Sequence, residues 1–285
     1  MKRIRYGTGA IRHSNLYHKI ARALRPKFHK SHLAGGGIDW VKGYDCGQMV
    51  IKNQGRSFSC GGQAGAYWRE NQIRLLNNKY IPLSAKSIYS LVAYPQGGTT
   101  GSSLSAQLCL FGVNTEKDVP SYQSDGTPMT ELQYTDKSWL TPILKLDAAT
   151  RANLVKVSVK HTTDDIAQAV LSSGGVIWQI DGEDGHAWLG TDPTIPNNNG
   201  QEDWSHFMFS GGFLTRNNRQ TIKSTNSWGQ NIGDKGQQYF NDDYIKSPYL
   251  VDCFTFLPRS AFTPTGTPLQ WLLVMFQNML HIFSK

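Results

Sequence analysis

Cysteine is scarce in this chain. The 285 residues include only Cys46, Cys60, Cys109 and Cys253. Four cysteines cannot supply the dense disulfide framework of a small secreted scaffold, so we expect a reducing intracellular setting or the interior of an assembled particle. No secretory signal is recognisable, because the basic N-terminus is not followed by an apolar stretch. An acid-free, Arg-containing start also resembles an organelle transit peptide, which is the alternative.

Acidic residues are missing from residues 1–37, which hold nine Lys or Arg and four His. The rest of the chain has 20 basic and 21 acidic residues, so its body is close to neutral. A neutral body gives no reason to expect a domain that reads a specific nucleic acid. The basic arm could instead contact phosphate, a membrane surface or an acidic partner.

Long apolar runs are also rare. Residues 269–283 form an uncharged, mostly apolar stretch, but about 15 residues are too few for an ordinary membrane-spanning helix. We expect a helix that docks on the body or on a partner, with anchoring at a membrane surface as the alternative. Three glycines at 35–37 mark a first boundary. The predicted domains are therefore a basic N-terminal extension (1–37), a globular body (38–260), and a linker with a hydrophobic C-terminal helix (261–285).

The apolar periodicity changes along the body. It predicts helices over residues 60–76, 84–93 and 103–111, an irregular segment over 113–150, and a helix over 163–171. Strands are predicted over residues 155–159, 176–180, 206–213, 221–226 and 237–240. Helices that precede a sheet in the sequence indicate an α+β protein with two lobes.

Four residues in order indicate nucleophilic chemistry: Gln54, Cys60, His206 and Asn226. A cysteine attacks a carbonyl as the thiolate, which a helix N-terminus and a neighbouring imidazolium both stabilise. Cys60 is the candidate nucleophile, His206 the candidate base, and the Asn226 amide oxygen would orient the histidine. The Cys60 backbone N–H and the Gln54 side chain would bind the oxyanion. Trp228 is expected to shield the contact between His206 and Asn226, and no cofactor is required.

These residues lie in motifs that resemble those of the papain family of cysteine proteases. The nucleophile motif spans residues 53–60, the histidine motif 205–213, and the asparagine motif 222–229. The resemblance covers roughly 38–245. It implies a helical lobe that carries Cys60 and an antiparallel β lobe that carries His206 and Asn226. It also implies a papain-like endopeptidase acting on protein or peptide substrates through an acyl-enzyme.

The chain departs from the family pattern next to the nucleophile. Gly61 and Gly62 stand where the family nearly always has Trp and a small residue, and each weakens the start of a helix by roughly 1 kcal/mol relative to Ala. They either remove a shielding ring or make room for an unusual substrate. Ser57 stands where secreted family members often place a bridging cysteine.

Three further groups have two interpretations each. Gly97 and Gly98 resemble a glycine pair that lets a substrate backbone approach closely, and they also fit a simple turn after Pro95. His186 is a rival for the role of base. Acidic residues near it suggest a metal site, but no ligand spacing supports one, and we interpret them as a solvated turn.

The sequence is also compatible with two other functions. The same chemistry serves any acyl transfer, so the chain could hydrolyse peptidoglycan crosslinks or another isopeptide. Thiol hydrolases that act on cell walls usually have fewer residues between the catalytic cysteine and histidine than separate Cys60 from His206. An inactive protease-like scaffold with a structural or delivery role is the second alternative, with either terminal segment as a docking arm or as an inhibitory piece removed on maturation.

Overall fold

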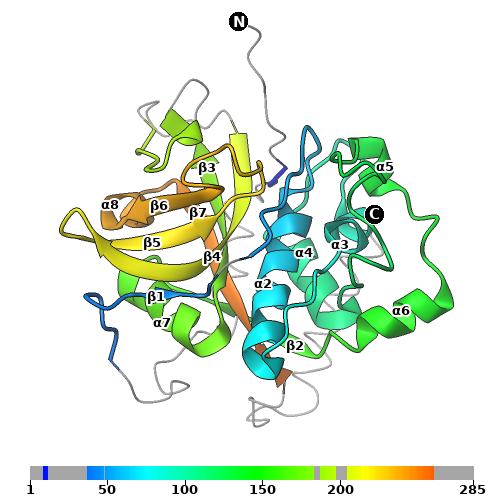
Figure 1. Cartoon of the computed structure of the whole chain (residues 1–285), viewed down its shortest axis with the longest axis horizontal. Coiled ribbons are helices and arrows are strands. Elements are labelled where there is room, and N and C mark those ends of the chain that lie inside the picture. Colours follow the sequence, from blue (N-terminus) through cyan, green and yellow to red (C-terminus); the bar gives the residue numbers. More distant parts are fainter. Residues whose placement is uncertain (1–8, 12–36, 48, 183–186, 197–203, 260–285) are drawn as a thin grey trace, which may run out of the picture.

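The computed structural model describes residues 9–11, 37–47, 49–182, 187–196 and 204–259. Within them the chain forms a helical lobe and a β lobe that lie side by side (Figure 1). Helices come first in the sequence and most of the sheet follows. The α+β class and the two lobes predicted from the sequence are therefore confirmed.

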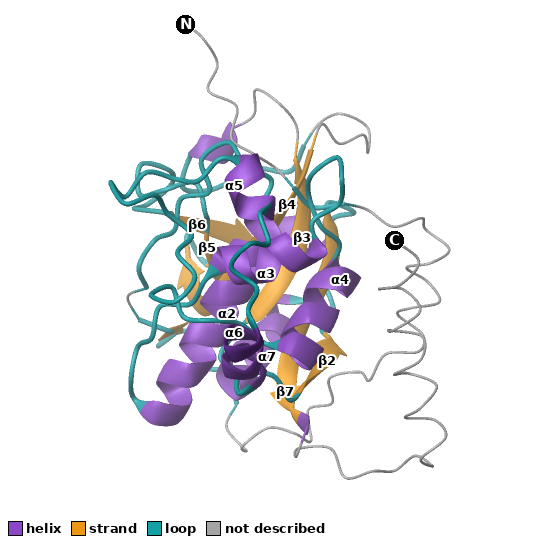
Figure 2. Cartoon of the chain, turned by 90° about the vertical axis from the view of Figure 1, so that its right-hand side faces the viewer, coloured by secondary structure: helices purple, strands orange, loops and turns teal. Residues whose placement is uncertain are grey.

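The helical lobe contains α2 (Cys60–Asn77), α3 (Ala85–Val92), α4 (Gly101–Ala106), the π-helical turn η2 (Gln107–Phe111), α5 (Glu131–Thr135) and α6 (Pro142–Ala149). When the right-hand side of Figure 1 faces the viewer, these helices lie in front of the strands (Figure 2). The β lobe contains β1 (Tyr44–Asp45), β2 (Leu154–Ser158), β3 (Val176–Gly182), β4 (Trp204–Arg216), β5 (Arg219–Thr225), β6 (Gln237–Asn241) and β7 (Leu250–Pro258). It also contains the helices α7 (Thr163–Ser173) and α8 (Asp242–Lys246) and the 3-10 turn η3 (Ala187–Leu189).

The seven strands form one antiparallel sheet in the order β2-β7-β3-β4-β5-β6, with β1 paired to β4. The long strand β4 pairs with β3 over residues 204–210 and with β5 over residues 209–216. This central position fixes the register of His206, which lies opposite Ile180 of β3.

Helix α2 packs directly on this sheet. The ring of Trp68 lies 4.7 Å from the ring of Phe256 in β7, and the ring of Tyr67 lies 6.2 Å from the ring of Phe209 in β4. All four side chains are buried. Burying an aromatic side chain contributes roughly 1.5–3 kcal/mol, so these contacts hold the start of α2 at a fixed place against β4.

Local hydrogen bonds explain where the helices begin. The Ser84 hydroxyl accepts the N–H of Ser87 at 2.9 Å, which is the predicted cap of α3. Helix α4 begins two residues earlier than predicted because Thr100 caps it, accepting the N–H of Ser103 at 3.2 Å. Gly112, with φ of 74°, ends the helical run as expected.

The prediction that residues 113–150 are irregular is wrong. Helix α5 starts with a capping box, in which Thr130 and Gln133 satisfy each other's backbone N–H groups. Helix α6 starts with Thr141 as cap and Pro142 in its first turn. Both helices are short, so their capping residues predict them better than apolar periodicity does.

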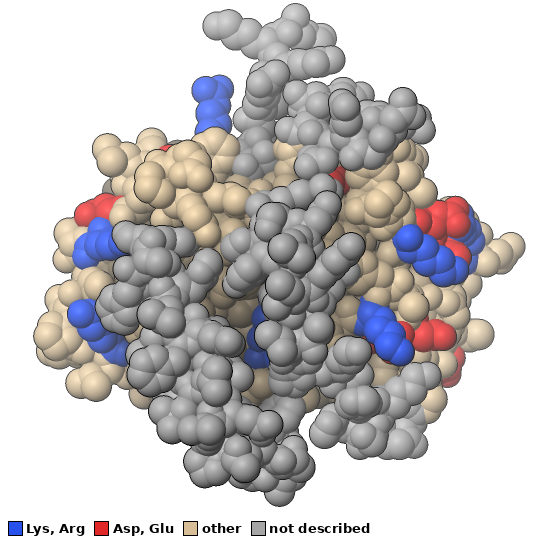
Figure 3. Space-filling view, turned by 180° about the vertical axis from the view of Figure 1, so that it is seen from behind, with Lys and Arg blue, Asp and Glu red and all other residues tan. Residues whose placement is uncertain are grey.

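The surface of the described residues carries charges of both signs, with Lys and Arg often beside Asp and Glu (Figure 3). All four cysteines are free thiols. None of the helices in the described ranges has the length and apolar character needed to span a membrane. The predicted helix over residues 269–283 lies outside the described residues.

Candidate active site

Cys60 is the first residue of α2 and its side chain is fully buried. The thiol sulfur accepts the backbone N–H of Gly9 at 3.3 Å. Burial raises the pKa of this thiol, and backbone groups of Phe207 and Gly61 close to the sulfur partly oppose that effect. Phe207 follows His206 on β4, so the thiol lies against the strand that carries the candidate base.

His206 is fully buried and is held by Asn226, the residue that follows β5. The His206 Nε2 atom and the Asn226 Oδ1 atom are 3.0 Å apart. Among the described residues, the other ring nitrogen, Nδ1, has no hydrogen-bond partner. The Trp228 ring lies over the histidine with its centroid 4.5 Å from the imidazole centroid, and it is 4% exposed. This arrangement keeps water from one side of the contact between His206 and Asn226.

A chain of amide contacts fixes the orientation of Asn226. Its Nδ2 donates to the Gln238 Oε1 at 2.6 Å. The Gln238 Nε2 in turn donates to the carbonyls of Trp188 at 2.5 Å and Gly190 at 3.0 Å. Two carbonyl acceptors leave Gln238 only one favourable orientation, and this leaves Asn226 with its oxygen toward His206. Sequence reasoning missed Gln238, which is one of two adjacent glutamines in β6.

We expect Gln238→Met to lower kcat/KM for peptide cleavage about tenfold. The variant keeps the side-chain length but leaves the buried Asn226 amide without its acceptor, so the imidazole loses its fixed orientation. Gln237→Met is the matched control, because neighbouring side chains in a strand point to opposite faces. Equal kinetics for the two variants would show that Gln238 does not help to orient the catalytic histidine.

Gln54 lies in the loop before α2 and joins it to the asparagine motif. Its Nε2 donates to the carbonyl of Ser57 at 2.8 Å, and its Oε1 accepts the Ser227 hydroxyl at 2.6 Å. The Gln54 backbone N–H also donates to the Ser227 carbonyl at 2.8 Å. The loop that precedes Cys60 is therefore tied to the residue that follows Asn226. Of the four predicted site residues, Gln54 lies in this loop, Cys60 starts α2, His206 lies on β4 and Asn226 follows β5.

Burial keeps the thiol and the imidazole neutral in this structure. It raises the pKa of Cys60 to about 11, against the smaller lowering effect of the backbone N–H groups around the sulfur. It lowers the pKa of His206 to about 4, against the opposing effect of the hydrogen bond to Asn226. At neutral pH the covered site therefore holds an uncharged thiol and an uncharged ring.

Residues 9–11 run across the seam between the lobes and cover this site (Figure 1). The carbonyl of Gly9 accepts the N–H of Thr99 at 2.6 Å, and the N–H of Ile11 donates to the Thr99 carbonyl at 2.7 Å. On the other side, the N–H of Ala10 donates to the Ser205 carbonyl at 3.2 Å. The segment thus pairs with Thr99 through an isolated parallel β-bridge and contacts both lobes. The group it presents to the sulfur is an N–H, not a carbonyl carbon that a thiolate could attack.

The Gly97 and Gly98 pair lies beside residues 9–11. Gly98 has φ of +80°, and a Cβ atom built on it would lie 2.5 Å from the carbonyl oxygen of Gly9. Gly97 has φ of +87°, and its Cβ atom would collide with the ring of Phe58. The turn interpretation also fits, since the Gly97 N–H donates to the Tyr94 carbonyl at 2.9 Å. In this structure the backbone that closely approaches Gly97 and Gly98 belongs to Gly9 of the same chain and not to a substrate.

The interpretation that Gly61 and Gly62 make room for a substrate is wrong. A Cβ atom on Gly61 would lie 2.4 Å from the Thr99 methyl group, and one on Gly62 would lie 2.6 Å from the Ala85 carbonyl oxygen. The space is therefore filled by α3 and by the segment before α4. The two glycines allow α2 to pack closely on these elements.

Other candidates fall outside this cluster. His186 and the acidic residues at 183 and 184 lie outside the described residues. Within the described ranges, no group of three or more His, Cys, Asp or Glu side chains is arranged to hold a metal ion.

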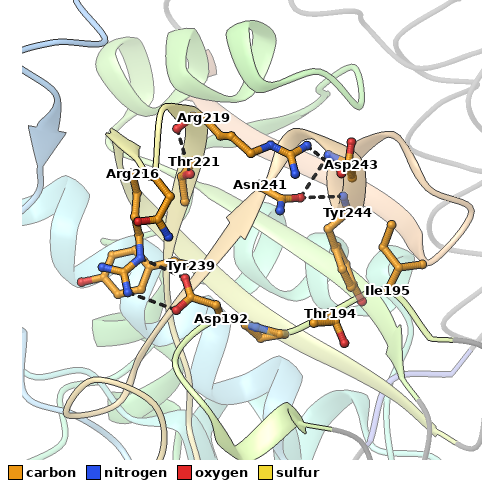
Figure 4. A pocket seen from close by; sticks show the side chains of 12 residues that line it. Asp192, Thr194, Ile195, Arg216, Arg219, Thr221, Tyr239, Asn241, Asp243 and Tyr244 are labelled. Carbon is orange, nitrogen blue, oxygen red and sulfur yellow. Dashed lines mark hydrogen bonds and ion pairs between the residues drawn. The ribbon is translucent and has the colours of Figure 1, made fainter.

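A hollow of about 430 Å³ lies at the far end of β5 from Asn226 (Figure 4). The two guanidinium groups that line it are already paired. Arg216 contacts both oxygens of Asp192 at 2.9 and 3.0 Å, and Arg219 contacts Asp242 and Asp243 at 2.6 and 2.7 Å. These ion pairs account for its charges, and no ligand is needed to balance them.

Two lobes that meet where a helix presents a cysteine to a strand bearing a histidine point to the cysteine proteases. Residues 36–246 match the family described as "Papain family cysteine protease", and the chain belongs to that family. The match covers the nucleophile, histidine and asparagine motifs. The chain is therefore a papain-like member of the thiol proteases, a group of hydrolases. The comparison with curated protein sequences gives no match.

Solved structures with the same fold are distant in sequence. Xylellain, a cysteine protease from Xylella fastidiosa, is similar with a TM-score of 0.68 and 18% identity, over 90% of this chain and 98% of its own. Procathepsin B S9 from Trypanosoma congolense has a TM-score of 0.61 and 13% identity, over 88% and 86%. Digestive procathepsin L 3 of the Tenebrio molitor larval midgut has a TM-score of 0.56 and 17% identity, over 84% and 78%. At these identities the likeness concerns the fold.

Proposed function

We propose that this chain is a cysteine endopeptidase that hydrolyses peptide bonds through an acyl-enzyme. The observation that supports the proposal is that Cys60 belongs to the same buried cluster as Phe207, the residue next to His206 on β4, while His206 lies 3.0 Å from Asn226. Family membership supports protein or peptide substrates.

In the first step, His206 takes the thiol proton and the Cys60 sulfur forms a bond to the peptide carbonyl carbon. The carbonyl oxygen becomes an oxyanion, for which the Cys60 backbone N–H and the Gln54 side chain are the candidate donors. When this intermediate collapses, the C–N bond breaks and the imidazolium gives its proton to the leaving amine. A water molecule, deprotonated by His206, then attacks the thioester carbon. The C–S bond breaks, the acyl part leaves as a carboxylic acid, and the sulfur takes the proton back from the imidazolium. No cofactor enters these steps.

Cys60 and His206 are both neutral while residues 9–11 cover them, as expected for a form of the enzyme that is not ready to react. Charge separation between Cys60 and His206 is unfavourable while both are buried. We propose that residues 9–11 must leave the seam before a substrate enters. A substrate backbone would then take the free N–H and C=O groups of Thr99, with the Gly97 and Gly98 turn allowing its close approach.

The two alternative functions have no specific observation in their favour. A peptidoglycan or isopeptide hydrolase would use the same thiol and imidazole. An inactive scaffold has no need for the buried amide chain through Gln238 that orients Asn226. The docking roles proposed for the basic arm and the apolar tail concern residues that lie mostly outside the described ranges.

The purified chain tests the proposal when incubated with a denatured protein and, separately, with bacterial cell walls. We expect internal cleavage of the protein, detected by mass spectrometry, and no release of wall fragments. Both incubations should include a form in which the N-terminal arm has been displaced or removed, since the covered form has low activity. Lysis of walls without proteolysis would favour the isopeptide alternative, and the absence of both activities would favour the scaffold.

A further inference from the structure

Two loops flank the candidate nucleophile, and no covalent bond joins them. One is the segment before α2, which ends in Phe58, Ser59 and Cys60. The other is the turn at residues 94–99, which carries the edge paired with residues 9–11. Ser57 stands at a position where secreted family members often have a bridging cysteine, and its hydroxyl instead contacts the Gln54 carbonyl and the Ser59 hydroxyl.

A single carboxylate connects the two loops. Glu131 accepts the backbone N–H of Phe58 on Oε2 at 2.7 Å and the Tyr89 hydroxyl on Oε1 at 2.5 Å. The Tyr89 oxygen in turn accepts the N–H of Gly98 at 2.7 Å. The Phe58 ring also packs against Gly97. Glu131 therefore links the residue two positions before the nucleophile to the glycine pair of the opposite loop.

The direction of each hydrogen bond is fixed by chemistry. A backbone N–H can only donate, so the oxygen of Tyr89 accepts from Gly98 and its hydrogen is given to Glu131. Burial and the hydrogen bond to Glu131 both raise the pKa of Tyr89, so the hydroxyl keeps its proton. Both oxygens of Glu131 thus receive hydrogens, which a carboxylate satisfies and an amide cannot.

The fold places Glu131 by means of α5. The capping box at Thr130 puts Glu131 in the first turn of this helix. Tyr134, one turn later, packs edge-on against Tyr89 with ring centroids 6.2 Å apart. The Tyr134 hydroxyl also accepts the Gln63 side chain of α2 at 2.8 Å. A helix from a long connection is therefore anchored both to the nucleophile helix and to α3.

We propose that Glu131 is a positioning residue that keeps the Cys60 loop and the substrate-binding edge at a fixed separation, as a non-covalent substitute for a disulfide. Through Phe58 it holds the backbone that leads into Cys60, whose N–H is a candidate oxyanion donor. Through Tyr89 it holds Gly98, next to the Thr99 groups that would pair with a substrate. The inference rests on the proposed peptidase function for its kinetic consequences but not for its structural ones.

The two arms of this network can be separated by mutation. Tyr89→Phe removes the link to Gly98 and leaves Glu131 on Phe58. We expect a several-fold higher KM with little change in kcat, because pairing with a substrate backbone is similar in the ground state and the transition state. Glu131→Ala releases both loops, and we expect kcat to fall about tenfold in addition, since the backbone around the oxyanion donor loses its fixed position.

Amide hydrogen exchange in the full chain provides a readout that does not depend on activity. In Tyr89→Phe the amide of Gly98 should exchange at least about tenfold faster while that of Phe58 is unchanged, and in Glu131→Ala both should accelerate. Asp136→Asn, at the C-terminal end of the same helix, is the control and should leave both amides and the kinetics as in the wild type.

The possible outcomes separate the two proposals. Accelerated exchange at both amides in Glu131→Ala, with wild-type protein that cleaves no peptide, would support the link and overturn the peptidase function. Wild-type exchange at Phe58 and Gly98 in a folded Glu131→Ala protein would overturn the link, whatever its activity. An equal loss of kcat in Tyr89→Phe and Glu131→Ala would also contradict it, because only the second variant releases the Cys60 loop.

Discussion

Cys60→Ala is expected to lower the rate of peptide cleavage by roughly 10⁵–10⁶-fold, the scale on which a nucleophile contributes in such a catalytic unit. Removing the sulfur leaves no atom that can form the thioester, while the His206 and Asn226 pair stays in place. The loss should appear in kcat, because the thiol bonds to the substrate only as the reaction proceeds. Single-turnover cleavage of a labelled peptide measures the effect.

The control for this prediction is Cys109→Ala. Cys109 is half-buried, and burial raises its pKa to about 12, so it stays a thiol at neutral pH. Its removal should leave cleavage unchanged. Full activity in Cys60→Ala, or loss of activity in Cys109→Ala alone, would assign the chemistry to another residue.

Gly9→Val is expected to increase both cleavage and labelling of Cys60 by about a hundredfold. A Cβ atom on Gly9 would lie 1.8 Å from the carbonyl oxygen of Phe58, and no rotamer relieves this contact because the backbone fixes the position of a Cβ atom. The segment must therefore leave the seam. It gives up three backbone hydrogen bonds worth roughly 1 kcal/mol each, or about a hundredfold in the equilibrium between covered and open forms.

The matched control is Gly37→Val. Gly37 has no atom within 4 Å of its would-be Cβ, and it adjoins the same N-terminal arm. This variant should label and cleave at the wild-type rate. If Gly9→Val also behaves as the wild type in both assays, residues 9–11 do not control access to Cys60.

The sequence predicted the elements that carry the candidate site because their signals are local. The helix at Cys60 has an apolar face of several turns, and the strand at His206 alternates between small, aromatic and polar residues. Both were found within two or three residues of their ends. The motifs alone also predicted a contact between His206 and Asn226, and the observed distance of 3.0 Å agrees with that prediction.

The features that sequence reasoning missed depend on distant parts of the chain. Gln238 matters only because the carbonyls of Trp188 and Gly190 lie beside it, and nothing in its own neighbourhood indicates this. Strand β7 was not predicted, although it lies between β2 and β3 in the sheet. Its nearly continuous burial hides the alternation that marks a half-exposed strand.

The segment 9–11 that covers the site was missed for another reason. The basic charge of residues 1–37 indicated an external arm, and charge says little about a short apolar piece within it. Gly9 and Ala10 fit the seam because they are small and can pair through backbone groups alone. Such pairing has no sequence signature beyond the absence of a large side chain.

The central claim is that Cys60 and His206 form a charged pair once residues 9–11 have left, and the rate of Cys60 alkylation as a function of pH tests it most directly. In the wild type the rate should stay low through neutral pH, because burial holds the pKa of the thiol at about 11. In Gly9→Val the rate should rise at a pH well below the ordinary thiol pKa of about 8.5, and adding His206→Ala should return it to that value. A profile in Gly9→Val that follows an ordinary thiol and does not change when His206 is removed would contradict the account.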